Sequence, residues 1–336
     1  MFTRTSFQSD DAVPLADFIN DLRRNHWTLT SLAFLRKPAI VPLVTPEALI
    51  VANERTDCIG IYLLKKDGEI ISMLHVSDKY GDGKVAVFSG AETHPRYQRR
   101  GMFWRQLFGP CLREMCESDF EYIEAITWTF NRKGIPLYKR IGFRGVPGTS
   151  LVMENYLPMI LRHPATRAFF AGHDYIRTLQ NRRSYGYDSK EFQGMRLFEY
   201  HWRAGLDELL VIVDWQRKQI VSIQGSAWAV WCFVVRENPF RIFYRLENKG
   251  QGDLPFRIQI RSGYRGESSQ QKIPAGQVRT GNIQIDDPQG ESTLEARVEI
   301  ELAGQQVPFV VRRYGQGGKE GAQFAREHVN RKEKAA

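Results

Sequence analysis

The apolar and polar positions near the start of the chain alternate between the periods of strands and of helices. FTRTSF, residues 2–7, alternates as a strand does, and Asp10 and Asp11 stand where an N-cap is expected before the helix-like run VPLADFINDL. GIYLLKKDGEIISMLHV, residues 60–76, holds two apolar runs around an Asp-Gly pair. That pattern predicts a β-hairpin.

The same mixture of patterns continues to residue 157. KVAVFSGAET, residues 84–93, predicts a strand in which Gly90 indicates a bulge or a close backbone approach. An amphipathic helix follows, and Pro110 is expected to kink its third turn because proline has no N–H. The remaining elements are a strand, a short helix and a last strand, at 122–130, 131–140 and 149–157. The sequence therefore predicts a mixed α/β domain over residues 1–157.

The second half of the chain has a different period. Residues 158–206 show no clear period and are expected to form a connector of short helices and loops. From 207 to 315 the period is two: LEARVEIEL, residues 294–302, alternates apolar and charged positions, as antiparallel strands with one wet face do. The fold class expected is α+β, with a C-terminal antiparallel β-sandwich over 207–315 and a charged flexible tail over 316–336.

Composition narrows the class of protein. The chain has 336 residues, 42% of them hydrophobic, and its longest apolar runs, such as AWAVWCFVV at 227–235, are too short to cross a bilayer. No signal-peptide pattern follows Met1, so a cytoplasmic protein with no membrane partner is expected. The four cysteines and seven histidines show no ligand spacing, and neither a disulfide framework nor a metal site is expected.

The formal net charge of +9 is concentrated in two windows. Residues 96–113 hold five arginines and no acid, and residues 132–144 hold five Lys or Arg and no acid, so these windows sum to +10 and the rest to about −1. Because the excess is local to one constellation, nucleic acid is not expected as a partner.

The stretch QRRGMF, residues 98–103, stands at the point where the amphipathic helix begins. A helix N-terminus leaves backbone N–H groups unpaired and is a natural seat for phosphate. Gly101 has no Cβ to keep a ligand from the backbone, and donors surround it at Gln98, Arg99, Arg100 and Arg105. A pyrophosphate is the ligand that this arrangement suits best.

This strand, basic glycine turn and helix resemble the acyl-CoA-binding segment of the GNAT superfamily of N-acetyltransferases. The family pattern is Arg or Gln, two residues, Gly, one residue, then Gly or Ala, and Phe103 stands here where a small residue is usual. A second GNAT pattern follows the next strand at the family's intervals: Asn131, Tyr138, Gly142 and Phe143. The resemblance covers residues 1–157 and does not reach the β-rich half.

The resemblance implies a GNAT-like fold, acetyl-CoA or another acyl-CoA as cofactor, and direct attack of an amine on the thioester. It implies that Tyr138 protonates the leaving thiolate, with Glu92 as first and His94 as second candidate for the base. Glu124 and Thr129 on the neighbouring strand are further options for the base. The residues that it places on the cofactor are Thr93, Gln98, Arg99, Arg100, Gly101, Met102, Phe103 and Asn131.

The function predicted is therefore that of an acyl-CoA-dependent N-acetyltransferase acting on a small-molecule or peptide amine, with a C-terminal domain that binds the acceptor or a partner. The alternative is a GNAT-like module that binds CoA without transferring and acts as a ligand-responsive interaction protein. The sequence leaves open the acceptor, the acyl length and the oligomeric state, a homodimer being one alternative.

Overall fold

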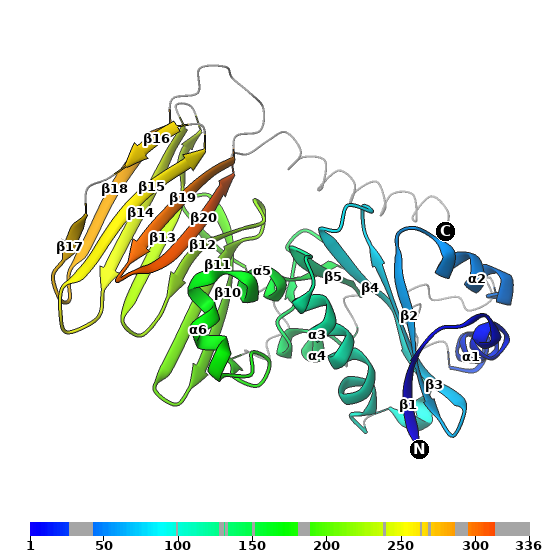
Figure 1. Cartoon of the computed structure of the whole chain (residues 1–336). Coiled ribbons are helices and arrows are strands. Elements are labelled where there is room, and N and C mark those ends of the chain that lie inside the picture. The colour runs from blue at the N-terminus through cyan, green and yellow to red at the C-terminus, as the bar shows by residue number, and fades with distance from the viewer. Residues whose placement is uncertain are drawn as a thin grey trace. The chain divides into compact units, whose positions relative to one another are not determined.

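The computed structural model describes residues 1–26, 43–98, 100–127, 131, 134–149, 152–180, 189–237, 240–262, 264–267, 270–285 and 295–312 (Figure 1). The chain divides into two compact units. Unit 1 comprises Met1–Tyr138 and Ser150–Met159, and unit 2 comprises Lys139–Thr149 and Ile160–Ala336. None of the helices in the described ranges is both long and apolar enough to cross a membrane.

Unit 1 contains one mixed sheet, whose hydrogen-bonded order runs β1-β2-β3-β4-β5-β7. Its strands are β1 (Phe2–Ser6), β2 (Cys58–Lys66), β3 (Glu69–Asp78), β4 (Val85–Thr93), β5 (Tyr122–Ile126) and β7 (Val152–Asn155). Only β4 and β5 pair in parallel among these strands. Strands β2 and β3 form the predicted hairpin, and its turn residues Asp67 and Gly68 have φ of 51° and 87°, as a tight two-residue turn requires.

Helices cover both faces of this sheet, as Figure 1 shows. The helical elements of this part of the chain are η1 (Ser9–Asp11), α1 (Ala12–Asn25), α2 (Pro46–Glu54), η5 (Pro95–Tyr97), η6 (Phe103–Phe108), α3 (Gly109–Glu117), α4 (Gly134–Arg140) and α5 (Leu157–Arg162). On one face, Leu22 of α1 and Leu49 of α2 share a core cluster with Ile61 and Met73. On the other, the ring of Phe108 in η6 lies 5.1 Å from that of Phe88 in β4.

The helix after the basic turn continues through Pro110. It begins as the π-helical segment η6 and goes on as α3, with the amide of Gly109 donating to the carbonyl of Trp104 five residues earlier. Pro110 has no N–H to donate, and the wider π-helical turn stands directly before it. A Cβ on Gly109 would lie 2.6 Å from the Trp104 carbonyl oxygen, so glycine is required there.

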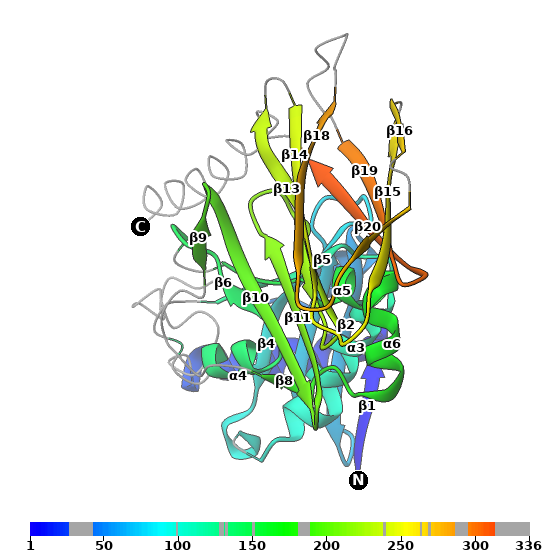
Figure 2. The ribbon, with the colours of Figure 1, turned by 90° about the vertical axis from the view of Figure 1, so that its left-hand side faces the viewer.

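Unit 2 holds helix α6 (Pro164–Gly172), the short strand β6 (Arg144–Gly145) and two antiparallel sheets (Figures 1 and 2). The larger sheet has the order β18-β14-β13-β12-β11-β10-β8, with β9 beside β10, and the smaller has the order β16-β15-β19-β20, with β17 beside β15. The strands are β8 (Leu179–Gln180), β9 (Lys190–Phe192), β10 (Met195–Ala204), β11 (Asp207–Asp214), β12 (Gln219–Gln224), β13 (Trp228–Glu237), β14 (Phe240–Asn248), β15 (Leu254–Ser262), β16 (Tyr264–Glu267), β17 (Gln271–Ile273), β18 (Val278–Ile285), β19 (Glu295–Leu302) and β20 (Gln305–Arg312).

The period-two pattern is realised as predicted in β19. Ala296, Val298, Ile300 and Leu302 are fully buried, whereas Glu295 and Arg297 are exposed. Strand β20 packs against β12 and β13 of the larger sheet, so the apolar side of the smaller sheet is covered. These antiparallel sheets, together with the mixed sheet of unit 1, confirm the predicted fold class, α+β.

The predicted connector over residues 158–206 needs a correction. Helices α5 and α6 occupy its first part, but its last part contains β8, β9 and β10 of the larger sheet. Strand β10 buries Met195 and Leu197 on one face and Tyr200 and Trp202 on the other. Apolar residues on both faces remove the alternation by which a strand is recognised, so the sheet begins before residue 207.

Candidate functional site

Strand β4 separates from β5 partway along its length. The two strands pair over Val85–Phe88 of β4, and the last pair is Phe88 with Ala125. Strand β4 then continues to Thr93 beside β3 alone, among the residues that the structure describes. The edge of β4 beyond Phe88 therefore presents backbone groups that no described residue of β5 pairs with.

A β-bulge at Gly90 lies in this part of β4. The register steps from His75–Ser89 to Met73–Glu92, so β4 carries one residue more than β3 across this interval. Gly90 has a φ of 58°, a left-handed conformation that favours glycine, and the predicted bulge is confirmed. Because residues paired across an antiparallel ladder share a face, the extra residue turns Glu92 to the face of Met73.

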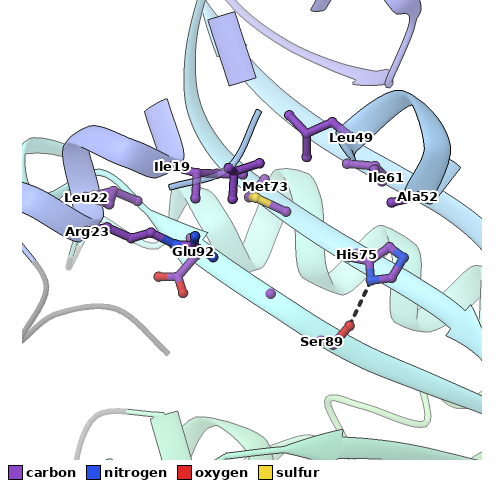
Figure 3. Close-up of a pocket in the computed structure, with 12 residues that line it drawn as sticks. Ile19, Leu22, Arg23, Leu49, Ala52, Ile61, Met73, His75, Ser89 and Glu92 are labelled. Atoms are coloured by element: carbon purple, nitrogen blue, oxygen red, sulfur yellow. Dashed lines mark hydrogen bonds between the residues drawn. The ribbon is translucent and has the colours of Figure 1, made fainter. Parts of the chain in front are cut away.

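Glu92 thereby lines a pocket of about 240 Å³ between α1, α2 and the sheet (Figure 3). The pocket walls come from these two helices and from strands β2, β3 and β4. The side chains that line it include Ile19, Leu22, Arg23, Leu49, Ala52, Ile61, Met73, His75, Ser89 and Glu92. Most of these are apolar, so the pocket favours an apolar occupant that carries few polar groups.

The polar side chains of the pocket stand in two pairs. His75 Nδ1 lies 2.9 Å from Ser89 Oγ, and burial lowers the pKa of His75, which is therefore neutral at physiological pH. Arg23 stands beside Glu92 in Figure 3. Burial lowers the pKa of Arg23, and the Glu92 carboxylate opposes that shift, which places the two charges within electrostatic range.

Tyr138 lies on the other face of the sheet, within electrostatic range of the same carboxylate. It lies on α4 and packs its ring 5.7 Å from Phe108, which itself packs on Phe88. Burial and the nearby Glu92 raise the pKa of Tyr138 to about 12, so its phenol keeps its proton at neutral pH. Two predicted catalytic residues, 46 positions apart in the sequence, thus lie within electrostatic range of each other.

The basic turn before η6 has the backbone that its sequence suggests. Gly101 is exposed and has a φ of 68°, which gives glycine a conformational reason to stand there in addition to the absence of a Cβ. Arg105 folds back so that its Nη2 donates to the carbonyl of Arg100 at 3.0 Å. Gln98 donates to the carbonyl of Thr93 at 3.1 Å. Arg99 lies outside the described residues.

The other predicted cofactor residues make contacts of their own. Thr93 Oγ1 lies 2.8 Å from Ser72 Oγ at the end of β4. Met102 is half-buried, and the half-buried Phe103 packs its ring 5.4 Å from that of Phe108, toward the core. Asn131 caps α4: its Oδ1 accepts from the amide of Gly134, and its Nδ2 donates to Thr127 Oγ1, both at 2.8 Å.

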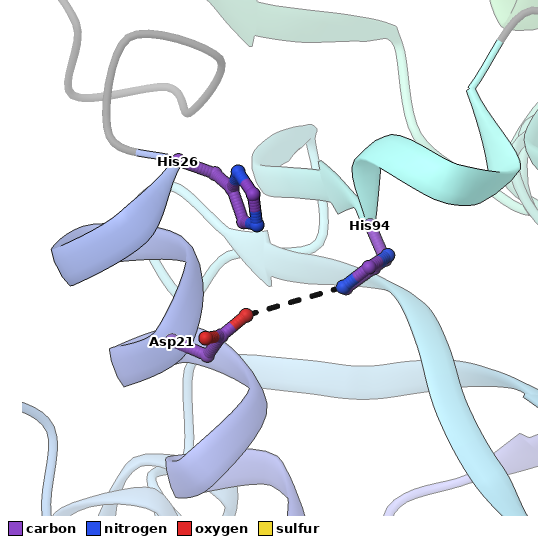
Figure 4. Close-up of side chains that lie close together, drawn as sticks. All are labelled: Asp21, His26 and His94. Atoms are coloured by element: carbon purple, nitrogen blue, oxygen red, sulfur yellow. Dashed lines mark ion pairs between the residues drawn. The ribbon is translucent and has the colours of Figure 1, made fainter.

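The second candidate base, His94, lies apart from Glu92. It precedes η5 and does not line the pocket, because β4 ends at Thr93 and His94 lies outside the strand. His94, His26 and Asp21 form a cluster whose ligand atoms all lie within 4.8 Å of one another (Figure 4). Burial lowers the pKa of His94, and the nearby His26 lowers it further.

The cluster gathers histidines that showed no ligand spacing in the sequence, because the fold rather than the spacing brings them together. His94 Nδ1 accepts from the amide of Arg96 at 3.3 Å, so in the neutral ring the proton sits on Nε2. That nitrogen faces Asp21 Oδ2 at 3.9 Å. A metal ion could bind this nitrogen only after the nitrogen had lost its proton.

Of the other options for the base, Glu124 is held in an ion pair. Lys79 Nζ donates to both of its carboxylate oxygens, at 2.7 and 2.8 Å. Thr129 lies outside the described residues. Sequence reasoning missed Arg23, His75 and Ser89, because a pocket between two helices and three strands depends on contacts far apart in the chain. The one local feature of the sequence that pointed to this pocket was Gly90, the bulge residue between Ser89 and Glu92.

The solved structures that this chain resembles include the following three. An acetyltransferase of the GNAT family from Streptococcus pneumoniae is 18% identical with a TM-score of 0.37. The match covers 46% of this chain and 98% of that protein. The PaiA N-acetyltransferase from Thermoplasma acidophilum, in complex with coenzyme A, is 15% identical with a TM-score of 0.36, covering 46% and 99% of the two chains. The ribosomal-protein-S5-alanine acetyltransferase from Vibrio fischeri is 15% identical with a TM-score of 0.37, covering 46% and 92%.

No curated protein matches this chain in sequence. A family model does match, over the region that carries the two motifs, the Gly90 bulge and the Glu92–Tyr138 pair, and it leaves the antiparallel sheets of unit 2 outside the match. The resemblance predicted from the motifs is thereby confirmed for the N-terminal part, which has a GNAT-like fold: residues 22–143 match the family described as Acetyltransferase (GNAT) family.

Proposed function

We propose that the chain is an acyl-CoA-dependent N-acetyltransferase that moves its acyl group to an amine by direct attack. The observation that carries the proposal is that β4 separates from β5 beyond Phe88, with Glu92 on the pocket face of the sheet and Tyr138 on the face of η6 and α4, within electrostatic range of each other. A carboxylate and a protonated phenol on two faces of a sheet suit a reaction whose two substrates enter from opposite sides.

The described residues fit a CoA thioester. The first amides of the helix that starts after Gly101 have no intrahelical partners, and the exposed Arg100 and Arg105 add charge for a diphosphate. The edge of β4 from Ser89 to Thr93 offers backbone groups of the kind that the amides of a pantetheine arm pair with. When bound, the cofactor supplies the activated acyl carbonyl.

In this proposal, Glu92 takes a proton from the amine nitrogen as that nitrogen bonds to the acyl carbon. Tyr138 gives its proton to the sulfur as the carbon–sulfur bond breaks, so that the products are an amide and a neutral thiol. The Tyr138 pKa of about 12 keeps the phenol protonated, and so able to donate, at the pH at which an amine is acylated.

The test is thioester consumption with a panel of amines, for the wild-type chain and for Tyr138→Phe. We expect Tyr138→Phe to lower kcat by about 10²- to 10⁴-fold and to leave acetyl-CoA affinity, measured by calorimetry, within about twofold. Tyr62→Phe is the matched control: burial likewise raises the pKa of Tyr62 to about 12, but its hydroxyl faces Glu114, and its loss should leave kcat unchanged.

Two outcomes would contradict the proposal in different ways. Tight acetyl-CoA binding with thioester consumption at the no-acceptor background for every amine would favour the non-catalytic CoA-binding module. If neither CoA nor acetyl-CoA bound measurably, both the transferase and the CoA-binding module would be excluded, because both functions require a CoA site.

A further inference from the structure

We infer that the acceptor is a small monoamine with an apolar body, whose nitrogen meets Glu92 and whose carbon skeleton fills the pocket between α1, α2 and the sheet. The inference rests on the proposed function and narrows it to one class of substrate. It follows from the size of the pocket, from the chemistry of its walls, and from the pairing of its polar groups.

The size of the pocket limits the acceptor. Its volume of about 240 Å³ equals the share of liquid volume taken by about eight water molecules, at about 30 Å³ each. A molecule of roughly eight non-hydrogen atoms fills such a space. Aminosugar antibiotics, with several rings, exceed it.

The walls of the pocket are apolar around most of its surface. Ile19 and Leu22 come from α1, Leu49 and Ala52 from α2, and Ile61 and Met73 from the sheet between them. Burying a hydroxyl against such walls without a hydrogen-bond partner costs free energy, of the order of 1–3 kcal/mol per group in proteins. An aminosugar, which carries a hydroxyl on most of its carbons, is therefore disfavoured and an alkyl or aryl body is favoured.

The polar groups that line the pocket are already engaged with one another. His75 contacts Ser89 through Nδ1, and its Nε2 lies 3.7 Å from Cys58 Sγ, so both ring nitrogens have neighbours in the protein. A substrate hydroxyl at that end would have to displace an existing contact. The Glu92 carboxylate, unlike the neutral His75–Ser89 pair, can form an ion pair or accept a proton, so the amine of the acceptor belongs at the Glu92 end (Figure 3).

The charges of the residues that line the pocket also favour a monoamine. Among the described lining residues Glu92 is the one acid, and Arg23 brings a positive charge beside it. A polyamine or an aminoglycoside carries several positive charges, and each beyond the first would meet Arg23 with no carboxylate to balance it. A monoamine carries a single positive charge, which the Glu92 carboxylate can balance by itself.

The experiment measures kcat/KM for a series of straight primary amines from ethylamine to octylamine, with 2-phenylethylamine, spermidine, glucosamine and kanamycin beside them. We expect kcat/KM to rise about fourfold for each added methylene, the factor that corresponds to burying one CH₂. The rise should stop at about eight non-hydrogen atoms, where the pocket is full.

A pair of variants on α2 checks that this pocket is responsible. Ala52→Leu puts three more carbons into the pocket, and the rise should then stop about three methylenes earlier. Val51→Leu is the matched control, because Val51 is 63% exposed and does not line the pocket. Circular dichroism and acetyl-CoA affinity should be the same for both variants as for the wild-type chain.

The outcomes separate this inference from the function on which it rests. A kcat/KM that is independent of chain length, or larger for spermidine, glucosamine or kanamycin than for hexylamine, overturns the inference and leaves the transferase standing. An unshifted stopping point in Ala52→Leu also overturns it, because the chain-length effect would then come from another surface. No turnover with any amine overturns the proposed function itself.

Discussion

The number of residues in β4 between Ser89 and Glu92 decides which face of the sheet Glu92 joins, and a change in that number is the sharpest test of the site. His75 pairs with Ser89 and Met73 with Glu92, so one residue of β4 is extra. Deleting Gly90 alone would leave Met73 paired with Glu92, whereas deleting Gly90 and Ala91 together would give a regular ladder in which Leu74 pairs with Glu92. Because a shift of one residue moves a side chain to the opposite face, Glu92 would then leave the pocket and turn toward η6.

The expected sizes follow from the local geometry. Loss of a general base lowers kcat by about 10²- to 10⁴-fold, and the deletion of Gly90 and Ala91 together should do the same as Glu92→Gln. Gly90→Ala should act differently. A Cβ there would lie 3.5 Å from Met73 Cε, an ordinary contact, so the main cost is the positive φ, about 1–2 kcal/mol of unfolding free energy.

The assay compares thioester turnover and urea unfolding for the double deletion, for Gly90→Ala and for Gly68→Ala. Gly68 has a φ of 87°, and a Cβ added to it would have no neighbour within 4 Å, so it carries the same kind of backbone cost in a hairpin turn outside the pocket lining. We expect similar stability losses for the two alanine variants, and a loss of turnover well beyond either in the double deletion. A folded double-deletion variant with wild-type kcat would refute the role given to Glu92 and to its position on the pocket face of the sheet.

Three further outcomes follow from other contacts. Gly109→Ala should lower the unfolding free energy by about 1–3 kcal/mol in urea, since the added Cβ would lie 2.6 Å from a carbonyl oxygen. Gly101→Val should weaken CoA binding in calorimetry, because a φ of 68° is unfavourable for a β-branched residue at the proposed phosphate seat, and unchanged affinity would place the diphosphate elsewhere. Burial lowers the pKa of His163 to about 4, below its ordinary 6.5, so its contribution to stability is present above about pH 6.5 and is lost as the pH falls toward 4. Between about pH 7.5 and 5 this loss is about 2 kcal/mol, and His163→Gln should remove that part of the pH dependence in tryptophan-monitored urea unfolding.

The sequence predicted the elements that local chemistry determines. The Asp-Gly pair at 67 and 68 specified a hairpin turn, and Gly90 specified a bulge, because both positions need backbone angles that few other residues adopt. The spacing from Asn131 to Tyr138 placed a candidate acid on α4. In each case the information lies within a few residues of the feature.

What the sequence did not predict depends on contacts between distant segments. Strand β10 was missed because packing on both of its faces hides the period of two. The pocket brings α1 and α2 over β2, β3 and β4, and no local pattern shows that Arg23 will stand beside Glu92. Pro110 was expected to kink its helix, and the sequence did not predict that the turn directly before it is π-helical, with Gly109 leaving room for the Trp104 carbonyl.

The electrostatics of Glu92 and Tyr138 support the roles proposed for them, independently of any relative. The negative charge of Glu92 adds to burial in raising the pKa of Tyr138 to about 12, so the carboxylate keeps the phenol protonated. A proton placed on Glu92 would remove that charge and make the Tyr138 proton easier to release. Proton uptake by one residue therefore assists proton release by the other, which is the coupling that acylation of an amine by a thioester needs.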